Sequence, residues 1–268
     1  MINKLIILLI SFFIFSNIAD ANTFTFETSN MEIFKEKNQI IAGKGKAFSS
    51  NKDLEINADK FKYLKDLGLL ETNGNGKAII KSKSLIIKFD SAFFDQKNST
   101  MKANGNIKIN QTDKKIFIET DKIFYDQANN LINSNTKTIL KDGFKNIYTV
   151  DSFIFEINKN LLKVINLESK DKDGNIIKTE IAYINTQSGK LFGKDVSIDF
   201  SKSYFNSDNE PRLKAVSANI NENITELSKG VFTTCKKRDD CPPWEMSAEK
   251  IQHDKNKKTI NYKNALLK

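Results

Sequence analysis

The stretch Ile116-Phe-Ile-Glu-Thr-Asp-Lys-Ile-Phe-Tyr-Asp-Gln-Ala-Asn-Asn130 has the pattern of a β-strand that runs into a polar turn. Its pattern centres on Asp121, because apolar or small residues lie three and one positions before this residue and two and four positions after it. The same offsets around five other acidic residues also carry mainly apolar or small side chains. We call the six acidic residues the anchors: Asp59, Asp90, Asp121, Asp151, Glu180 and Glu249.

The first five anchors recur about every 30 residues, a period typical of proteins that stack one structural unit on the next. The regular spacing weakens after Phe200, where the polar segment 201–212 predicts a longer loop. The pattern resumes near Lys214. We expect Ala218 to take the anchor position there, because it precedes Glu249 by one such period.

The phase of the pattern changes at each anchor. Side chains on one face of a strand recur at every second residue, so a regular strand would place the later apolar side chains at +1 and +3 rather than at +2 and +4. One extra residue at the anchor explains the change, and this predicts a β-bulge that bends and twists the strand. Repeated once per unit, such bulges would curl a sheet into a trough. The alternative is a tight bend at the corner of a β-sandwich.

The chain of 268 residues is long enough for one large β-domain or for two ordinary domains. It contains only 3 prolines, so it is neither collagen-like nor of low complexity. Its formal net charge of +9 favours anionic partners, which could be nucleic acid, anionic lipid or a phosphorylated glycan.

Residues 1–21 have a basic start, an apolar run from Leu5 to Phe15 and the small-x-small ending Ala19-Asp-Ala21. This arrangement predicts a secretory signal peptide that is cleaved before Asn22. The apolar run is shorter than the roughly 20 residues that a membrane-spanning helix needs, although an uncleaved inner-membrane anchor is the alternative. Because an exported protein does not meet chromosomal DNA, we expect no nucleic-acid partner.

Dipeptides that accept positive φ punctuate the chain and predict tight turns. No window has the apolar stripe of a helix, so we predict an all-β fold. No linker rich in Ser, Gly or Pro divides the chain, and we expect residues 22–268 to form one continuous domain. The predicted turns lie at Asn73–Gly76, Asn104–Gly105, Asp142–Gly143, Asp173–Gly174 and Ser188–Gly189.

The chain carries one histidine, His253, at the +4 position of its unit, where other units have Tyr or Phe. No nucleophile elbow, phosphate-binding loop or metalloprotease motif accompanies it. We therefore expect a structural histidine, no enzyme, no cofactor and no metal. The two cysteines, Cys235 and Cys241, are too few for a zinc site. In an oxidising compartment we expect them in disulfides, either with each other in a small loop or with partners elsewhere.

The segment Phe232-Thr-Thr-Cys-Lys-Lys-Arg-Asp-Asp-Cys-Pro-Pro-Trp-Glu-Met-Ser-Ala-Glu-Lys-Ile-Gln-His-Asp254, followed by Thr259-Ile-Asn-Tyr-Lys-Asn-Ala265, is the most specific part of the sequence. It resembles the lipopolysaccharide-assembly proteins of the Gram-negative outer membrane. The resemblance is to their periplasmic N-terminal domain, which is also called the organic-solvent-tolerance-A-like domain. The Thr-Thr-Cys start, the Pro-Trp and Ala-Glu pairs and the Asn-Ala end carry it. The repeated units with an acidic anchor resemble the same domain.

The resemblance implies a twisted β-jellyroll that forms an open trough with an apolar interior. Such a domain would carry lipopolysaccharide without catalysis at the periplasm and outer membrane, with the acyl chains inside and the sugars outside. The implied partners are lipopolysaccharide, other jellyrolls joined by end-to-end strand pairing, and an outer-membrane β-barrel with its lipoprotein plug. We expect the trough to be lined by Ile56, Phe61, Tyr63, Ile87, Phe89, Phe94, Ile118, Ile123, Tyr125, Phe153 and Phe155.

Full members of the resembled family continue into a large transmembrane barrel, whereas this chain stops at Lys268 without a long set of lipid-facing strands. We therefore expect either part of a longer protein or a stand-alone periplasmic one. Disulfides join the domain to the barrel in that family, which leaves partners outside this chain open for both cysteines. The alternative function is a structural adaptor that docks partners through exposed strand edges and binds no lipid. A third is an exported hydrolase that acts on lipid or glycan.

Overall fold

The computed structural model describes residues 23–170, 174–201, 209–237, 244–257 and 259–268. Their regular structure is one antiparallel β-sheet of 21 strands with three short 3-10 helices, which confirms the all-β prediction. The helices are η1 (Lys35–Lys37), η2 (Lys81–Lys83) and η3 (Ile157–Lys159). The strands are β1 (Thr25–Thr28), β2 (Met31–Phe34), β3 (Gln39–Ala42), β4 (Gly45–Phe48), β5 (Leu54–Ala58), β6 (Lys60–Leu64), β7 (Leu69–Ile80), β8 (Leu85–Asp95), β9 (Thr100–Gln111), β10 (Ile116–Asp126), β11 (Leu131–Ser134), β12 (Thr138–Lys141), β13 (Ile147–Val150), β14 (Ser152–Glu156), β15 (Leu161–Lys170), β16 (Ile176–Asn185), β17 (Leu191–Asp199), β18 (Arg212–Ile220), β19 (Ile224–Thr233), β20 (Met246–Asp254) and β21 (Thr259–Leu267).

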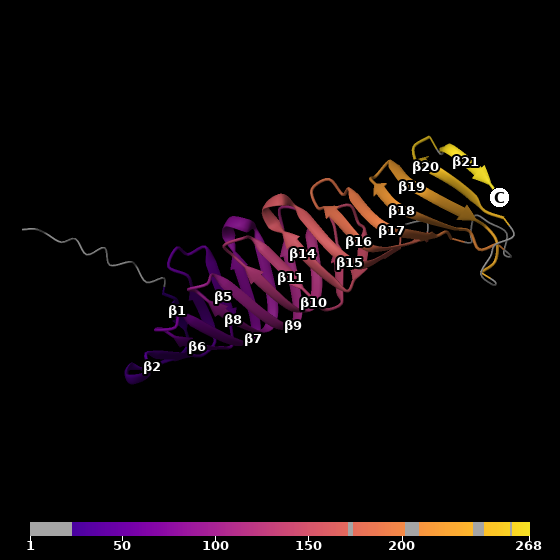
Figure 1. The fold of residues 1–268 in the computed structure, drawn as a ribbon. Helices are drawn as coiled ribbons and strands as arrows, with labels where there is room; N and C mark the ends of the chain where they lie inside the picture. The colour runs from indigo at the N-terminus through magenta and orange to yellow at the C-terminus, as the bar shows by residue number, and fades with distance from the viewer. Residues whose placement is uncertain (1–22, 171–173, 202–208, 238–243, 258) are drawn as a thin grey trace, which may run out of the picture.

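The chain runs back and forth as a meander, and we call each pass a rung. A rung is either one long strand that bends at its middle, such as β8, or two short strands in line, such as β5 and β6. The 21 strands form sixteen rungs, because five rungs consist of two strands each. Each rung pairs with the next along the chain, so the body is elongated, with β1 and β2 at one end and β21 at the other (Figure 1).

The bends follow the anchors, as the phase of the sequence predicted. The pairing register shifts beside Asp90 in β8 and beside Asp121 in β10. At Asp59 and Asp151 the rung divides into two strands, and Glu180 is passed over in the pairing of β16. We call the line of bends that crosses the sheet the crease. The half-rungs on either side of it are the two arms.

The burial pattern changes phase at the crease. In β8 the buried side chains before Asp90 are Leu85, Ile87 and Phe89, and those after it are Ala92 and Phe94. The last buried residue before the anchor and the first one after it are three positions apart, whereas buried residues in a regular strand are two apart. The extra residue at the bend therefore keeps the apolar side chains of both arms on the inward face.

Two of the predicted turns are wrong. Asn73–Gly76 lies in the middle of β7, and Asn104–Gly105 lies in the middle of β9. Gly74 and Gly105 have φ of 78°, and the asparagines that follow them are also left-handed. Asn-Gly pairs suit any left-handed backbone, and here they form the bulges of the crease rather than hairpins. Asp142–Gly143 and Ser188–Gly189 do lie in turns between strands, while Asp173 lies outside the described residues.

The prediction of an anchor position at Ala218 is also wrong. Ala218 is buried and pairs regularly with Gly193 and Leu227. The bend of β18 lies two residues earlier, at Val216, which is passed over in the pairing with both neighbouring strands. Val216 lies 33 residues before Glu249 rather than 31, so a period counted back from Glu249 missed the bend.

The inward faces of the two arms bury two hydrophobic cores. The main core contains buried side chains from Phe24 to Leu191, and the end core contains those from Val196 to Ile251. The main core includes nearly all the buried aromatic residues, whereas the end core is built from Val, Ile, Leu and Ala. The fold is thus a twisted β-jellyroll, a sheet that is creased along its length and closed around an apolar interior.

Candidate functional site

The eleven predicted lining residues all lie on the inward face and all belong to the main core. None is more than 5% exposed. They come from both arms, since Ile56, Ile87 and Ile118 precede the crease in their rungs while Phe61, Phe94 and Ile123 follow it. The predicted set is therefore one continuous interior surface. Its side chains are packed on one another, whereas the sequence predicted a trough that stands open.

Carboxylate–amide pairs along the crease hold the bends in place. Asn75 Nδ2 donates to Asp59 Oδ2 at 2.6 Å, and Asn106 Nδ2 donates to Asp90 Oδ2 at 2.7 Å. Each of these asparagines has a positive φ, a conformation that Asn tolerates better than most residues. Two further pairs repeat the arrangement: Asn166 with Asp151 at 2.8 Å and Asn264 with Glu249 at 2.6 Å.

A cluster of hydroxyl groups replaces the amide beside the anchor Asp121. The Thr120 hydroxyl lies 3.0 Å from that of Ser134 and 2.9 Å from that of Thr136. Thr138 donates to Thr120 at 2.9 Å and is fully buried. Because these hydroxyls satisfy one another, polar atoms can lie at the edge of the apolar interior without the cost of an unmade hydrogen bond.

Residues that the sequence analysis did not include in the lining fill much of the interior. The ring of Phe24 lies 5.6 Å from that of Tyr63 and 6.4 Å from that of Phe94, in edge contacts. Such pairs stabilise a core beyond the area that they bury. The rungs between anchors also contribute, and their own every-second-residue alternation was the available signal: Leu70, Ala78, Ile80, Met101, Ala103, Ile107 and Ile109.

The two arms meet again along a line opposite the crease, which we call the seam. One row of turns lies on each side of it. Lys83 Nζ of η2 donates to Asn158 Oδ1 of η3 at 3.0 Å. These two residues belong to different rows. Phe144 from one row packs against Gly189 of the other, so closely that a Cβ at residue 189 would lie 2.7 Å from the ring. Side chains rather than a β-ladder thus join the arms here.

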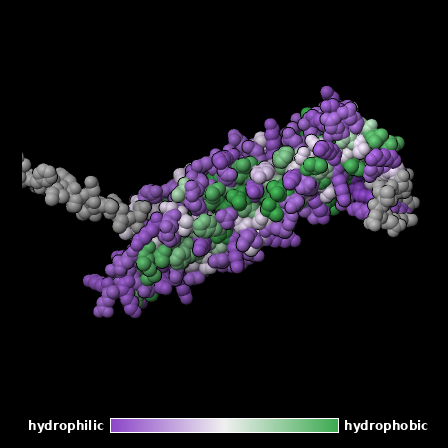
Figure 2. Space-filling view, in the orientation of Figure 1, coloured by the Kyte–Doolittle hydropathy of each residue, from purple (hydrophilic) through white to green (hydrophobic). Residues whose placement is uncertain are grey.

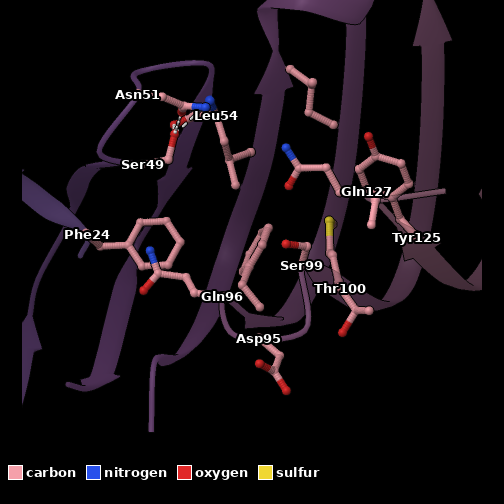
Figure 3. A pocket seen from close by; sticks show the side chains of 14 residues that line it. Phe24, Ser49, Asn51, Leu54, Asp95, Gln96, Ser99, Thr100, Tyr125 and Gln127 are labelled. Carbon is pink, nitrogen blue, oxygen red and sulfur yellow. Dashed lines mark hydrogen bonds between the residues drawn. The ribbon is translucent and has the colours of Figure 1, made fainter. Parts of the chain in front are cut away.

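A cavity of about 240 Å³ lies at the seam near the β1 end of the molecule (Figure 3). Its lining residues come from both rows of turns and from the strands behind them. Phe24, Leu54 and Ile80 supply apolar surface, and Ser49 and Gln96 supply polar surface. Tyr125 lies across the cavity from Phe24 (Figure 3).

The Tyr125 hydroxyl has no hydrogen-bond partner among the described residues, although the side chain is buried. Burial first, and then the nearby charges of Asp53 and Asp126, raise the pKa of Tyr125 to about 12. The hydroxyl is therefore neutral at physiological pH. Tyr63, in the equivalent position of an earlier rung, instead donates to Gln96 Oε1 at 2.9 Å.

The outer surface is mostly hydrophilic, with apolar side chains gathered along the middle of the visible face (Figure 2). Exposed ion pairs join neighbouring rungs, as between Lys62 and Glu71 at 3.4 Å and between Lys178 and Glu168 at 2.8 Å. Such exposed pairs contribute little stability. Because these pairs are neutral together, the excess of Lys and Arg over Asp and Glu gives the chain its net positive charge.

Both ends of the sheet expose strand edges and apolar side chains. Ile33 in β2 is 54% exposed, although it pairs with the buried Ile40 on the inward face. Tyr262 in β21 pairs with the buried Ile251 and is 40% exposed. Every residue of β21 is exposed. Within the described residues, the inward face thus continues to both ends of the sheet without a covering rung.

The structure describes two of the three residues in the cysteine and histidine predictions, Cys235 and His253. Cys235 is half-buried, forms no disulfide with a described residue, and has a thiol 3.8 Å from the Trp244 carbonyl oxygen. A hydrogen bond with Thr233 is the main cause that lowers the pKa of Cys235. Cys241 lies outside the described residues, so the disulfide stays a prediction. His253 pairs with Thr225 and Ile260 within the sheet, and its structural role stays a prediction.

Among the described residues no helix is long and apolar enough to cross a membrane. That part of the chain also contains no group of three or more His, Cys, Asp or Glu side chains placed to hold a metal ion.

The fold and its interior define an elongated β-jellyroll with an apolar space between two arms. The chain belongs to the OstA-like protein family, whose model matches residues 52–208. This confirms the predicted family, and all eleven predicted lining residues lie within the match. Among solved structures, the chain is similar to LptH from Pseudomonas aeruginosa, described as the LptA-homologous periplasmic component of the conserved lipopolysaccharide transport device. The identity is 15% and the TM-score 0.37, over 42% of this chain and 83% of that chain. No curated protein matches the chain.

Proposed function

We propose that the chain is a non-enzymatic module for lipopolysaccharide transport, exported to the periplasm and acting between there and the outer membrane. Its inward face would hold the acyl chains and pass them along the axis of the jellyroll. The main support is the continuous apolar interior that runs beneath a hydrophilic exterior in a member of the OstA-like family. The excess of Lys and Arg over Asp and Glu, 42 to 33, suits a phosphorylated lipid.

Acyl chains can enter this interior only if the arms separate, because the lining side chains are packed on one another. The seam is the place where separation costs least. Its side-chain contacts, such as Lys83 with Asn158, are few compared with the hydrogen-bond ladders that join successive rungs, and loss of one exposed hydrogen bond costs only about 1 kcal/mol. A lipid that replaces core contacts with its own apolar surface would offset the cost of opening.

End-to-end stacking would extend the interior into neighbouring modules. Because the number of rungs is even, the first and last rungs run in opposite directions across the crease. The β21 edge of one jellyroll can therefore pair antiparallel with the first rung of the next while both arms stay in line. Other jellyrolls, and an outer-membrane barrel with its lipoprotein plug, are the partners that we propose for these edges.

The exposed strand edges also support a second function, that of an adaptor that docks partners by edge pairing and carries no lipid. The two functions differ in what touches the inward face. Photo-crosslinking residues introduced at Ile123 or Phe153, which point inward, should capture lipopolysaccharide in cells with active transport. The matched positions Lys122 and Phe124 lie in the same rung as Ile123 and point outward, so they should capture little. Equal labelling from both faces, or none from the interior, would leave only the adaptor.

A further inference from the structure

Three lysines lie side by side on the outer face of one arm. Lys77 in β7 pairs with Lys88 in β8, and Lys88 pairs with Lys108 in β9. Directly opposed side chains of neighbouring strands have Cβ atoms about 5 Å apart, so the three ammonium groups share one patch of surface. We call these three residues the lysine cluster. Like charges that oppose each other in this way destabilise a sheet, so the cluster lowers the stability of the folded chain.

A second pair of opposed lysines on the outer surface is compensated, whereas this cluster is not. Lys250 faces Lys263 across the sheet, but each has a carboxylate oxygen within 3.4 Å. Lys77 and Lys88 form no hydrogen bond or ion pair with any described residue, and the carboxylate beside Lys108 lies 3.8 Å from its Nζ. The positive charge of the cluster is therefore left for a partner outside the chain.

The carboxylates beside the cluster are engaged elsewhere. Asp90 follows Lys88 by two residues and is also exposed, but its Oδ2 accepts a hydrogen bond from Asn106 at 2.7 Å. Asp59 is held in the same way by Asn75 at 2.6 Å. Both pairs brace the crease rather than neutralise the cluster. Because their negative charges border the cluster on its crease side, an anionic ligand would approach it from the seam side.

The seam side of the cluster suits the head of a lipid that leaves the interior. Ile79 and Ile86 pair with each other there and are half-buried on the outer face. Lys77 and Lys88 each lie three residues from the end of their strand at the seam, about 10 Å along an extended chain. Lys81, in the turn between these strands, is exposed and adds positive charge at the seam. A head group about 10 Å long would therefore reach the cluster.

The arrangement of the lysines favours phosphate over a single carboxylate. Lysine binds phosphate as a compact point charge, and a phosphate monoester has three acceptor oxygens and a charge of about −1.5 to −2 at pH 7. One such group between Lys77 and Lys88 can meet both ammonium groups at once, and Lys108 lies one rung further. A carboxylate carries a single charge, so it would leave the second lysine without a partner.

We propose that the lysine cluster binds a phosphate group on the head of the lipid whose acyl chains lie in the interior. The inference rests on the proposed function, because the interior must hold the acyl chains within reach of the seam. The cluster is then a second contact for the same ligand, on strands whose inward side chains, such as Ala78, Ile87 and Ile109, are buried in the main core. One arm thereby holds both parts of the lipid.

The test compares binding of lipopolysaccharide before and after a phosphatase has removed its phosphate groups. The wild type should bind the phosphorylated form about tenfold more tightly, as expected when several exposed ion pairs of modest strength act together. The triple variant Lys77→Gln, Lys88→Gln, Lys108→Gln should bind both forms equally. Equal binding of the two forms by the wild type, or a preference that survives in the triple variant, would overturn the proposal.

A control triple variant removes the same charge elsewhere. Lys62, Lys178 and Lys250 have carboxylates of their own at 3.4, 2.8 and 2.9 Å, so replacing all three by Gln should keep the preference. Stability provides a further readout. Lys88→Gln relieves like-charge contacts and should raise the urea midpoint at low salt, whereas Lys62→Gln should lower it slightly. A lower midpoint for Lys88→Gln would give the cluster a structural role and overturn the proposal.

Inorganic phosphate identifies the source of the bound group. It lacks the acyl chains that hold a lipid head near the seam, so at the same concentration as lipopolysaccharide it should leave the preference unchanged. Loss of the preference would assign the cluster to free phosphate and overturn the proposal. Capture of lipopolysaccharide at Phe153 separates this proposal from the proposed function. If capture occurs without the preference, only the lysine cluster is wrong. If the preference occurs without capture, the phosphate site stands and the transport function is wrong.

Discussion

The main core and the end core lie in the same creased sheet, but their interiors are filled differently. In the main core, large aromatic side chains such as Phe61, Phe153 and Phe155 are at most 2% exposed. In the end core, Ala215, Ala218 and Ala248 take many of the inward positions. Since stability follows the apolar area that is buried, the rungs of the main core should be held firmly, while those of the end core should open more readily.

The crease differs between the two regions as well. Three carboxylate–amide pairs brace the bends beside the main core. Beside the end core, Asp195 and Lys229 take left-handed bends, and Val216 occupies the bend of the rung between them. Among the described residues beside the end core, only Glu249 and Asn264 form such a pair. The comparison indicates that the end region is held together by fewer contacts of its own than the main region.

The largest expected effect comes from truncating a core aromatic. Phe153→Ala should lower the free energy of unfolding by about 3–5 kcal/mol, because it removes a fully buried ring and leaves a cavity. Leu227→Ala, at the equivalent depth of the end core, should cost about 2 kcal/mol, the lower end of the range for such truncations. Hydrogen exchange measured by mass spectrometry, segment by segment, checks both values. An equal loss of protection in the two regions would contradict the comparison.

The second prediction concerns alkaline pH. The folded main core keeps Tyr125 protonated up to its pKa of about 12, whereas in the unfolded chain tyrosine ionises near its ordinary value of 10. The unfolded state therefore binds fewer protons above pH 10, and stability falls as the pH rises from about 10 to about 12. By pH 11 this loss amounts to about 1.4 kcal/mol.

Urea unfolding at pH 9 and pH 11 measures the effect, with Tyr125→Phe as the variant that should lack this part of the pH dependence. Tyr262 in β21 provides the contrast. Burial raises its pKa as well, but the side chain is 40% exposed, so Tyr262→Phe should change the pH dependence less. If Tyr125→Phe lost stability between the two pH values as steeply as the wild type, the hydroxyl would not be held in an apolar environment.

The sequence predicted the bends and the inward face because both depend on local geometry. A change of phase beside Asp90 reports the bulge directly, and the residues on either side of it show which face is apolar. The sequence did not, however, predict which asparagine forms a hydrogen bond with each anchor carboxylate. Asn75 and Asn106 lie in Asn-Gly contexts that hairpin turns share, and only the pairing of adjacent rungs shows them to be bulges.

The seam could not be predicted from the repeat. Lys83 and Asn158 are 75 residues apart, and their meeting depends on the twist that accumulates over several rungs. The same twist sets the distance between the arms, so the period alone could not decide whether the interior stands open or packs on itself. The cavity and the unsatisfied hydroxyl of Tyr125 follow from that distance and were missed for the same reason.

The smallest expected effect tests the crease. Asn106→Ala removes the hydrogen bond to Asp90 and places alanine at a φ of 46°, so it should lower the free energy of unfolding by about 1 kcal/mol.

Lys229→Ala is the matched change beside the end core. Lys229 also has a positive φ, of 51°, and lysine and alanine carry a similar backbone cost in that conformation. Its side chain makes no hydrogen bond or ion pair with a described residue, so the substitution removes no bond. Its expected effect is near zero, and Asn106→Gly, which keeps the backbone conformation but not the bond, should fall between the two. Urea unfolding of the three variants separates the contributions. If Asn106→Gly were as stable as the wild type, the left-handed backbone rather than the carboxylate–amide pair would be what the crease depends on, and the contrast between the two regions would rest on their cores alone.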